Sequence, residues 1–182
     1  LFCPVSGRKT AKLQMCTQEG ENVNVVAVRG NFDDCQTGVK KIFGSEECKA
    51  KLKEKNYLLS SANSINFGRL APQIAYYFSA YCDLVTSEQI KMGDKVNFTV
   101  PTGNFGNILA AYYAKRMGLP VGTLVCASNK NNVLTDFWAK GTYDSKRPFY
   151  KTMSPSMDIL VSSNLERLIF ELSGRDAALT KE

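Results

Sequence analysis

Histidine is absent from this sequence, and none of its six cysteines forms a Cys-x-x-Cys pair. Because these residue types supply most zinc ligands, both absences argue against a metal centre. Apolar runs of about 20 residues, which a membrane-spanning helix needs, are also missing, and no secretory signal is recognisable. We therefore expect a cytoplasmic protein with no metal site and no membrane contact, whose cysteines are reduced and mostly buried.

Two common phosphate-binding motifs are missing as well. The glycines do not form the dinucleotide fingerprint Gly-x-Gly-x-x-Gly, and there is no Gly-Lys-Ser or Gly-Lys-Thr. A glycine-bearing loop is nevertheless present at 101–107, between a strand-like run at 95–100 and a helix-forming run at 108–118. Such a loop directs backbone N–H groups and the positive end of a helix at one point, which suits a phosphate. On glycine spacing alone, a turn that merely joins strand to helix is the more common explanation.

The charge of the chain is only mildly unbalanced, because 23 basic and 17 acidic side chains give a formal net charge of +6. The lysines between positions 40 and 55 are interrupted by glutamates, which predicts a solvated helical face. A nucleic-acid site would need a denser basic stripe interleaved with aromatic side chains, so we expect no nucleic-acid partner. The mild excess suits an anionic small molecule equally well.

Strand-like and helix-like segments alternate along the chain. Strands are expected at 23–28, 57–59, 96–100 and 122–127, and residues 1–4 have the composition of the end of a buried strand. Helices are expected at 36–43, 70–81, 108–118, 131–140 and 164–172. This alternation predicts an α/β fold with three layers, in which helices flank a mostly parallel sheet. The longest irregular stretch, at 142–155, is expected near the site.

Three polar turns follow three of the expected strands, at 60–66, 102–107 and 128–132. Ligands of parallel α/β sheets bind beyond the carboxyl ends of the strands, so the three turns are predicted to line one rim. Arg69 and Lys130 would add positive charge to it. The alternative is that Asn and Ser occur there simply as turn and cap residues.

Four motifs, taken in this order, resemble one family, the threonine synthases. They are Ser61-Ala62-Asn63-Ser64-Ile65-Asn66 with Arg69, Pro101-Thr102-Gly103-Asn104-Phe105-Gly106-Asn107, Ala127-Ser128-Asn129 with Asn131, and Ser154-Pro155-Ser156-Met157-Asp158-Ile159. The resemblance extends over nearly the whole chain, and several motifs in register are far more specific than one loop.

The resemblance implies a pyridoxal-phosphate enzyme of fold type II that converts O-phospho-L-homoserine and water to L-threonine and phosphate. Arg69 would clamp the phosphate or carboxylate of the substrate, although an ion pair with a protein carboxylate is equally consistent with the sequence. By position, the residues that match the cofactor-phosphate cradle are Gly103, Asn104, Phe105, Gly106 and Asn107. Those that match the substrate motif are Asn63, Ser64, Asn66 and Arg69, while Ser154, Ser156 and Asp158 match a motif to which no role is assigned.

One part of the family pattern is missing. The lysine that forms the Schiff base lies in an N-terminal motif resembling Ala-Phe-Lys-Asp, which does not occur here, and no other lysine can be nominated in its place. We therefore assign no catalytic residue and expect a fragment that is inactive alone. By analogy, residues 1–56 would complete a smaller mobile domain and residues 57–182 would form part of the larger cofactor domain, with exposed sheet edges that favour self-association.

Other functions remain open from the sequence. The chain could belong to another fold-type-II lyase, or to a relative with an altered substrate, although the motif at 63–69 argues against distant relatives. A different class is a non-catalytic phosphate-ligand-binding or partner-binding domain, which the missing lysine supports.

Overall fold

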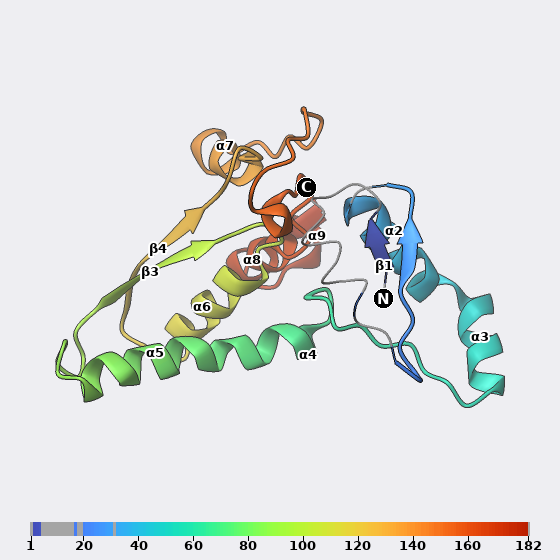
Figure 1. Ribbon diagram of the computed structural model, residues 1–182. Coiled ribbons are helices and arrows are strands. Elements are labelled where there is room, and N and C mark those ends of the chain that lie inside the picture. The colour runs from blue at the N-terminus through green and yellow to red at the C-terminus, as the bar shows by residue number, and fades with distance from the viewer. Residues whose placement is uncertain (1, 5–16, 18–19, 31, 182) are drawn as a thin grey trace.

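A computed structural model describes residues 2–4, 17, 20–30 and 32–181. Its strands form two parallel pairs, β1 (Phe2–Pro4) with β2 (Val26–Val28) and β3 (Val96–Pro101) with β4 (Val121–Ala127). In Figure 1 the first pair lies beside helix α2 (Phe32–Gly44), while the second lies at the other end of the molecule. The predicted α/β class with parallel pairing is confirmed.

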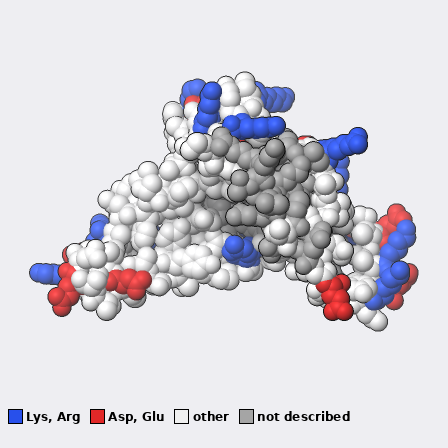
Figure 2. Space-filling model, viewed as in Figure 1, with Lys and Arg blue, Asp and Glu red and all other residues white. Residues whose placement is uncertain are grey.

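Helix α3 (Glu46–Glu54) carries three of the lysines that suggested a solvated face, Lys49, Lys51 and Lys53. Its N-cap Ser45 accepts a hydrogen bond from the Cys48 N–H at 3.2 Å, and none of its residues is buried. Two exposed ion pairs run along it, Lys49 with Glu46 and Lys51 with Glu47. In Figure 2 the two charges alternate over this helix. The prediction of a mixed, solvated helical face is therefore confirmed.

The rest of the described chain builds the region around β3 and β4. The expected helix at 70–81 is divided into α4 (Phe67–Leu70), a 3₁₀ turn (Ala71–Gln73) and α5 (Ile74–Thr86), because Pro72 can only stand in a first turn. Helix α6 (Gly106–Arg116) connects β3 to β4. The chain continues through α7 (Val133–Lys140), a 3₁₀ turn (Pro155–Met157), α8 (Leu165–Leu172) and α9 (Ala177–Lys181).

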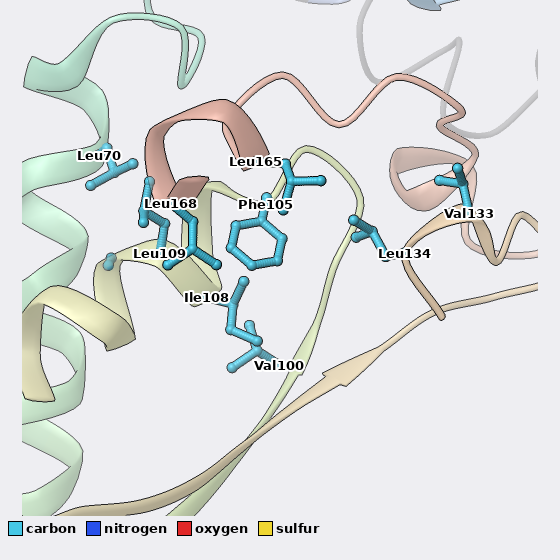
Figure 3. Packing of buried hydrophobic residues seen from close by; sticks show 10 residues of the cluster. Leu70, Val100, Phe105, Ile108, Leu109, Val133, Leu134, Leu165 and Leu168 are labelled. Carbon is cyan, nitrogen blue, oxygen red and sulfur yellow. The ribbon is translucent and has the colours of Figure 1, made fainter. Parts of the chain in front are cut away.

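The hydrophobic core lies around α6, as Figure 3 shows. Leu109 is fully buried and packs in one cluster with Leu70 and Phe105. Burying a leucine side chain contributes about 1.5–3 kcal/mol, so this cluster fixes the position of α6 and of the loop before it. Ala110, Ala111 and Ala114 are also fully buried, and their small side chains allow neighbouring elements to approach the helix closely.

Some expectations about the fold were wrong. Residues 57–59 form no strand, because the Tyr57 N–H bonds back to the Leu52 carbonyl of α3 and the Leu58 side chain is 92% exposed. The cysteines are not mostly buried, since of the four described only Cys35 is buried and Cys82 is exposed.

Within the described residues, no helix is long and apolar enough to cross a membrane.

Candidate phosphate-binding site

The loop that follows β3 turns sharply into α6 at Phe105. This residue has φ +65°, a left-handed conformation that costs a non-glycine residue free energy. Its ring is only 3% exposed and belongs to the core cluster, so burial of the ring compensates for the backbone strain. Phe105 therefore anchors the turn from inside and sets the direction of the first turn of α6.

The loop contains a run of backbone N–H groups that have no acceptor in the described part of the chain. The Thr102 N–H donates to the Ala127 carbonyl at 2.8 Å, and the Leu109 N–H donates to the Phe105 carbonyl at 3.1 Å. Between these two bonds, no described residue accepts a hydrogen bond from the N–H groups of residues 103–108. Most of these residues are buried. Because an unpaired buried N–H is costly, such a run is suited to a ligand with several acceptor oxygens.

Two carbonyl groups of the same loop accept hydrogen bonds from the segment that precedes α8. Ser162 Oγ donates to the Gly103 carbonyl at 2.6 Å. The Asn104 carbonyl accepts both the backbone N–H and the side-chain Nδ2 of Asn164, at 3.0 and 2.9 Å. In a trans peptide the N–H points away from the C=O of the same unit, and the structure has no cis bond among the described residues. Fixing these two carbonyls therefore turns the N–H groups of Asn104 and Phe105 to the opposite side.

A cavity of about 210 Å³ lies against the loop. Its floor is formed by residues 101–107. The cation in its lining is Arg69, which has no carboxylate partner among the described residues. The remaining lining residues are Ala62, Ser64, Gln73, Ser156 and Met157.

The two glycines of the loop allow its neighbours to approach the backbone. A Cβ at Gly106 would lie 3.0 Å from the Ser64 Cβ, and one at Gly103 would lie 2.8 Å from the Ile159 Cδ1. Larger residues would push these neighbours away. The sequence motif thus places glycine where the loop packs between the 60–66 turn and the segment at 156–159.

The residues predicted to bind substrate divide into two groups. Ser64 and Arg69 line the cavity. The side-chain oxygen of Asn63 instead accepts the Ile65 N–H at 3.1 Å, and that of Asn66 caps α4 by accepting the Gly68 N–H at 3.0 Å. In this structure the two asparagines shape the turn, and a ligand-binding role for any of the four stays a prediction.

The third polar turn does not line the cavity, so the expectation of one common rim was wrong for it. Asn129 and Asn131 direct their amide groups to the Asp158 carboxylate, at 2.8 and 3.2 Å. Lys130 Nζ lies 4.1 Å from the centre of the Tyr150 ring. These side chains are held by protein partners because the turn packs against the irregular stretch that follows α7.

Sequence reasoning missed two residues that join the loop to the 60–66 turn. Asn164 is fully buried and donates to Ser64 Oγ at 2.9 Å. Arg167 on α8 donates to the Ser64 and Ile65 carbonyls at 2.9 and 2.6 Å. The sequence indicated Asn164 only as the start of a helix.

The fold and the site define an α/β protein in which a parallel strand ends in a loop of backbone N–H groups that have no acceptor among the described residues. No protein-family model matches the chain. It is 50% identical to human threonine synthase-like 1 over 173 residues, covering 94% of this chain and 23% of that protein. It is 46% identical to threonine synthase from Eremothecium gossypii over 157 residues, covering 86% of this chain and 29% of the relative.

A solved structure agrees with these relatives. The crystal structure of threonine synthase from Brucella melitensis with bound pyridoxal phosphate matches with a TM-score of 0.77 and 42% identity. The match covers 99% of this chain and 37% of that one. The chain is thus a homologue of a segment of the threonine synthases and threonine synthase-like proteins, of fold type II, and spans well under half the length of these relatives.

Proposed function

We propose that the Gly103–Asn107 loop binds the phosphate of pyridoxal phosphate as part of a threonine synthase-type site. The observation that carries this proposal is the run of N–H groups at 103–108 without acceptors among the described residues, beside a cavity of about 210 Å³. The complete protein would convert O-phospho-L-homoserine and water to L-threonine and phosphate. The relatives named threonine synthase support this activity.

The donors of the loop fit a phosphate that is anchored and not transferred. They are neutral backbone N–H groups at the start of an 11-residue helix, whose dipole favours an anion. Ser163 Oγ donates to the Asn104 Oδ1 at 3.4 Å, and the Asn104 amide nitrogen has no acceptor among the described residues. No lysine stands in the loop, so no charge is supplied to a leaving phosphate there.

Pyridoxal phosphate, when bound, supplies an electron sink for carbanion chemistry. The role of this chain is to hold the phosphate and to orient the substrate beside it. Arg69 lies in the cavity lining without a carboxylate partner among the described residues, so its planar guanidinium is free to bind the carboxylate or phosphate of the substrate. The Ser64 hydroxyl, which accepts from Asn164, also lines the cavity.

We place the domain boundary near residue 56. Two observations support it: Asn56, two residues after the end of α3, has φ +59°, and Tyr57 and Leu58 are 65% and 92% exposed. A hydrogen bond of 3.4 Å between Gln36 Nε2 and Asn63 Oδ1 links the two parts across this segment. The covalent lysine would come from residues other than these 182, so the isolated chain is expected to be inactive.

The test is cofactor affinity in the full-length protein. Asn104→Ala and Gly106→Val should weaken pyridoxal phosphate binding by at least about tenfold, or roughly 1.4 kcal/mol. Gly38→Val is the matched control, because a Cβ at Gly38 on α2 meets no atom within 4 Å. Unchanged affinity in both loop variants would remove the assignment. Cofactor binding without phosphate release from O-phosphohomoserine would favour the alternative, a non-catalytic phosphate-ligand-binding domain.

A further inference from the structure

The Asp158 carboxylate is buried and is satisfied by hydrogen bonds alone. The residue is 6% exposed, and no described lysine or arginine forms an ion pair with it. Its Oδ1 accepts from Asn129 Nδ2 at 2.8 Å, Asn131 Nδ2 at 3.2 Å and Thr152 Oγ1 at 2.6 Å. Its Oδ2 accepts the Thr152 N–H at 2.9 Å.

These bonds join three separate segments. Asn129 and Asn131 follow β4, Thr152 belongs to the irregular stretch after α7, and Asp158 ends the 3₁₀ turn at 155–157. The Asn131 amide also donates to the Tyr150 carbonyl at 2.7 Å and accepts the Tyr150 N–H at 2.9 Å. Without the carboxylate, the buried Asn131 and the half-buried Asn129 and Thr152 would lose their common acceptor, which is costly.

The residues on both sides of Asp158 touch the phosphate loop. Ser156 and Met157 line the cavity. A Cβ at Gly103 would lie 3.4 Å from both the Met157 Cα and the Ser156 carbonyl oxygen, and 2.8 Å from the Ile159 Cδ1. The segment held by Asp158 therefore forms one wall of the cavity and limits the space open to the loop.

We propose that Asp158 is a positioning residue for phosphate binding, which acts by pinning the wall at 156–159 against Gly103. This inference rests on the proposed cofactor-phosphate site. In this proposal, Asn129, Asn131 and Thr152 fix the position of the carboxylate, although they do not line the cavity themselves. Asp158 itself does not line the cavity.

The test compares two ligands that differ in the phosphate alone, pyridoxal phosphate and pyridoxal, by titration of the full-length protein. Asp158→Asn replaces an acceptor oxygen by an amide donor, which faces the amide and hydroxyl donors of Asn129, Asn131 and Thr152. The wall at 156–159 should then lose its fixed position, and the preference for pyridoxal phosphate over pyridoxal should fall roughly tenfold. General structural damage would weaken both ligands equally and leave their ratio unchanged. If Asp158→Asn does not fold, Thr152→Val takes its place, because it removes one donor to the carboxylate with little change in volume. Its preference for pyridoxal phosphate over pyridoxal should also fall, but by less.

Exchanging donor and acceptor provides the rescue. In Asn129→Asp/Asp158→Asn the new carboxylate at 129 can accept from the new amide at 158, so the double variant should regain part of the lost preference. A wild-type preference retained in both Asp158→Asn and Thr152→Val would overturn the positioning role alone. A wild-type protein with no preference would overturn the proposed phosphate site itself.

Discussion

The Asn164 side-chain amide donates to the Asn104 carbonyl at 2.9 Å, across 60 positions of the sequence. The same amide nitrogen reaches Ser64 Oγ, 100 positions away, also at 2.9 Å. One fully buried side chain thus fixes the phosphate loop and the 60–66 turn relative to each other. The floor of the cavity and one of its walls depend on this residue.

Replacing Asn164 should therefore destabilise the protein. Asn164→Ala leaves the side chain of Arg167 without one acceptor and Ser64 Oγ without its donor. We expect a loss of about 1–3 kcal/mol in the free energy of unfolding, measured by urea denaturation. Asn132→Ala is the control, because the Asn132 side chain caps no N–H of α7. Equal effects of the two variants would contradict the role given to Asn164.

The Glu171 carboxylate on α8 predicts a pH dependence. Its side chain is 6% exposed and is bonded by Arg175, Arg116 and Tyr113. The hydrogen bond from Arg175 is the main cause that lowers the pKa of Glu171 below its ordinary value of 4.5. A lowered folded-state pKa stabilises the protein above pH 4.5 and ceases to do so as the pH falls through the lowered value.

In Glu171→Gln, the urea concentration at the midpoint of unfolding should therefore fall less steeply as the pH drops below 4.5. The variant should also be less stable than the wild type near neutral pH. Glu54→Gln, at an exposed position of α3, serves as the control. A decline of unchanged steepness in Glu171→Gln would show that other carboxylates govern acid unfolding.

Cys126 on β4 predicts slow thiol chemistry. Burial raises the pKa of the Cys126 thiol above its ordinary value of 9.0, since it lies in an apolar recess of about 440 Å³ with Trp138 and Leu124. Because the thiolate is the nucleophile, alkylation by iodoacetamide at pH 8 should be slower at Cys126 than at the exposed Cys82. Peptide mass spectrometry measures both rates in one sample. Faster labelling at Cys126 would contradict the burial described.

The packing of the core predicts that shortening the Leu109 side chain strongly lowers the free energy of unfolding. Leu109→Ala removes a side chain that is fully buried between α6 and its neighbours. We expect a loss of about 2–5 kcal/mol in the free energy of unfolding, since a cavity adds to the lost transfer free energy. Leu179→Ala on α9, where the side chain is 57% exposed, should cost less than about 0.5 kcal/mol.

The sequence predicted best the helices and strands, whose formation depends on residues close together along the chain. The strand at 96–101, helix α6, the strand at 121–127 and helix α8 lie within two residues of their expected ends, because each has a clear period and a terminating residue. The run at 57–59 failed since a short apolar segment becomes a strand only beside a partner. The pairing of Asn164 with Ser64 and of Asp158 with Asn129 spans 100 and 29 positions, and no local pattern encodes it.

The lack of histidine has a consequence for the cavity beside the loop. Among the described residues, its lining holds backbone amides, hydroxyls, three amide side chains and one guanidinium, with no imidazole, thiol or carboxylate. A phosphate monoester, by contrast, takes up its second proton near pH 6. The contribution of this loop to phosphate affinity should therefore follow the ligand's own titration around this pH.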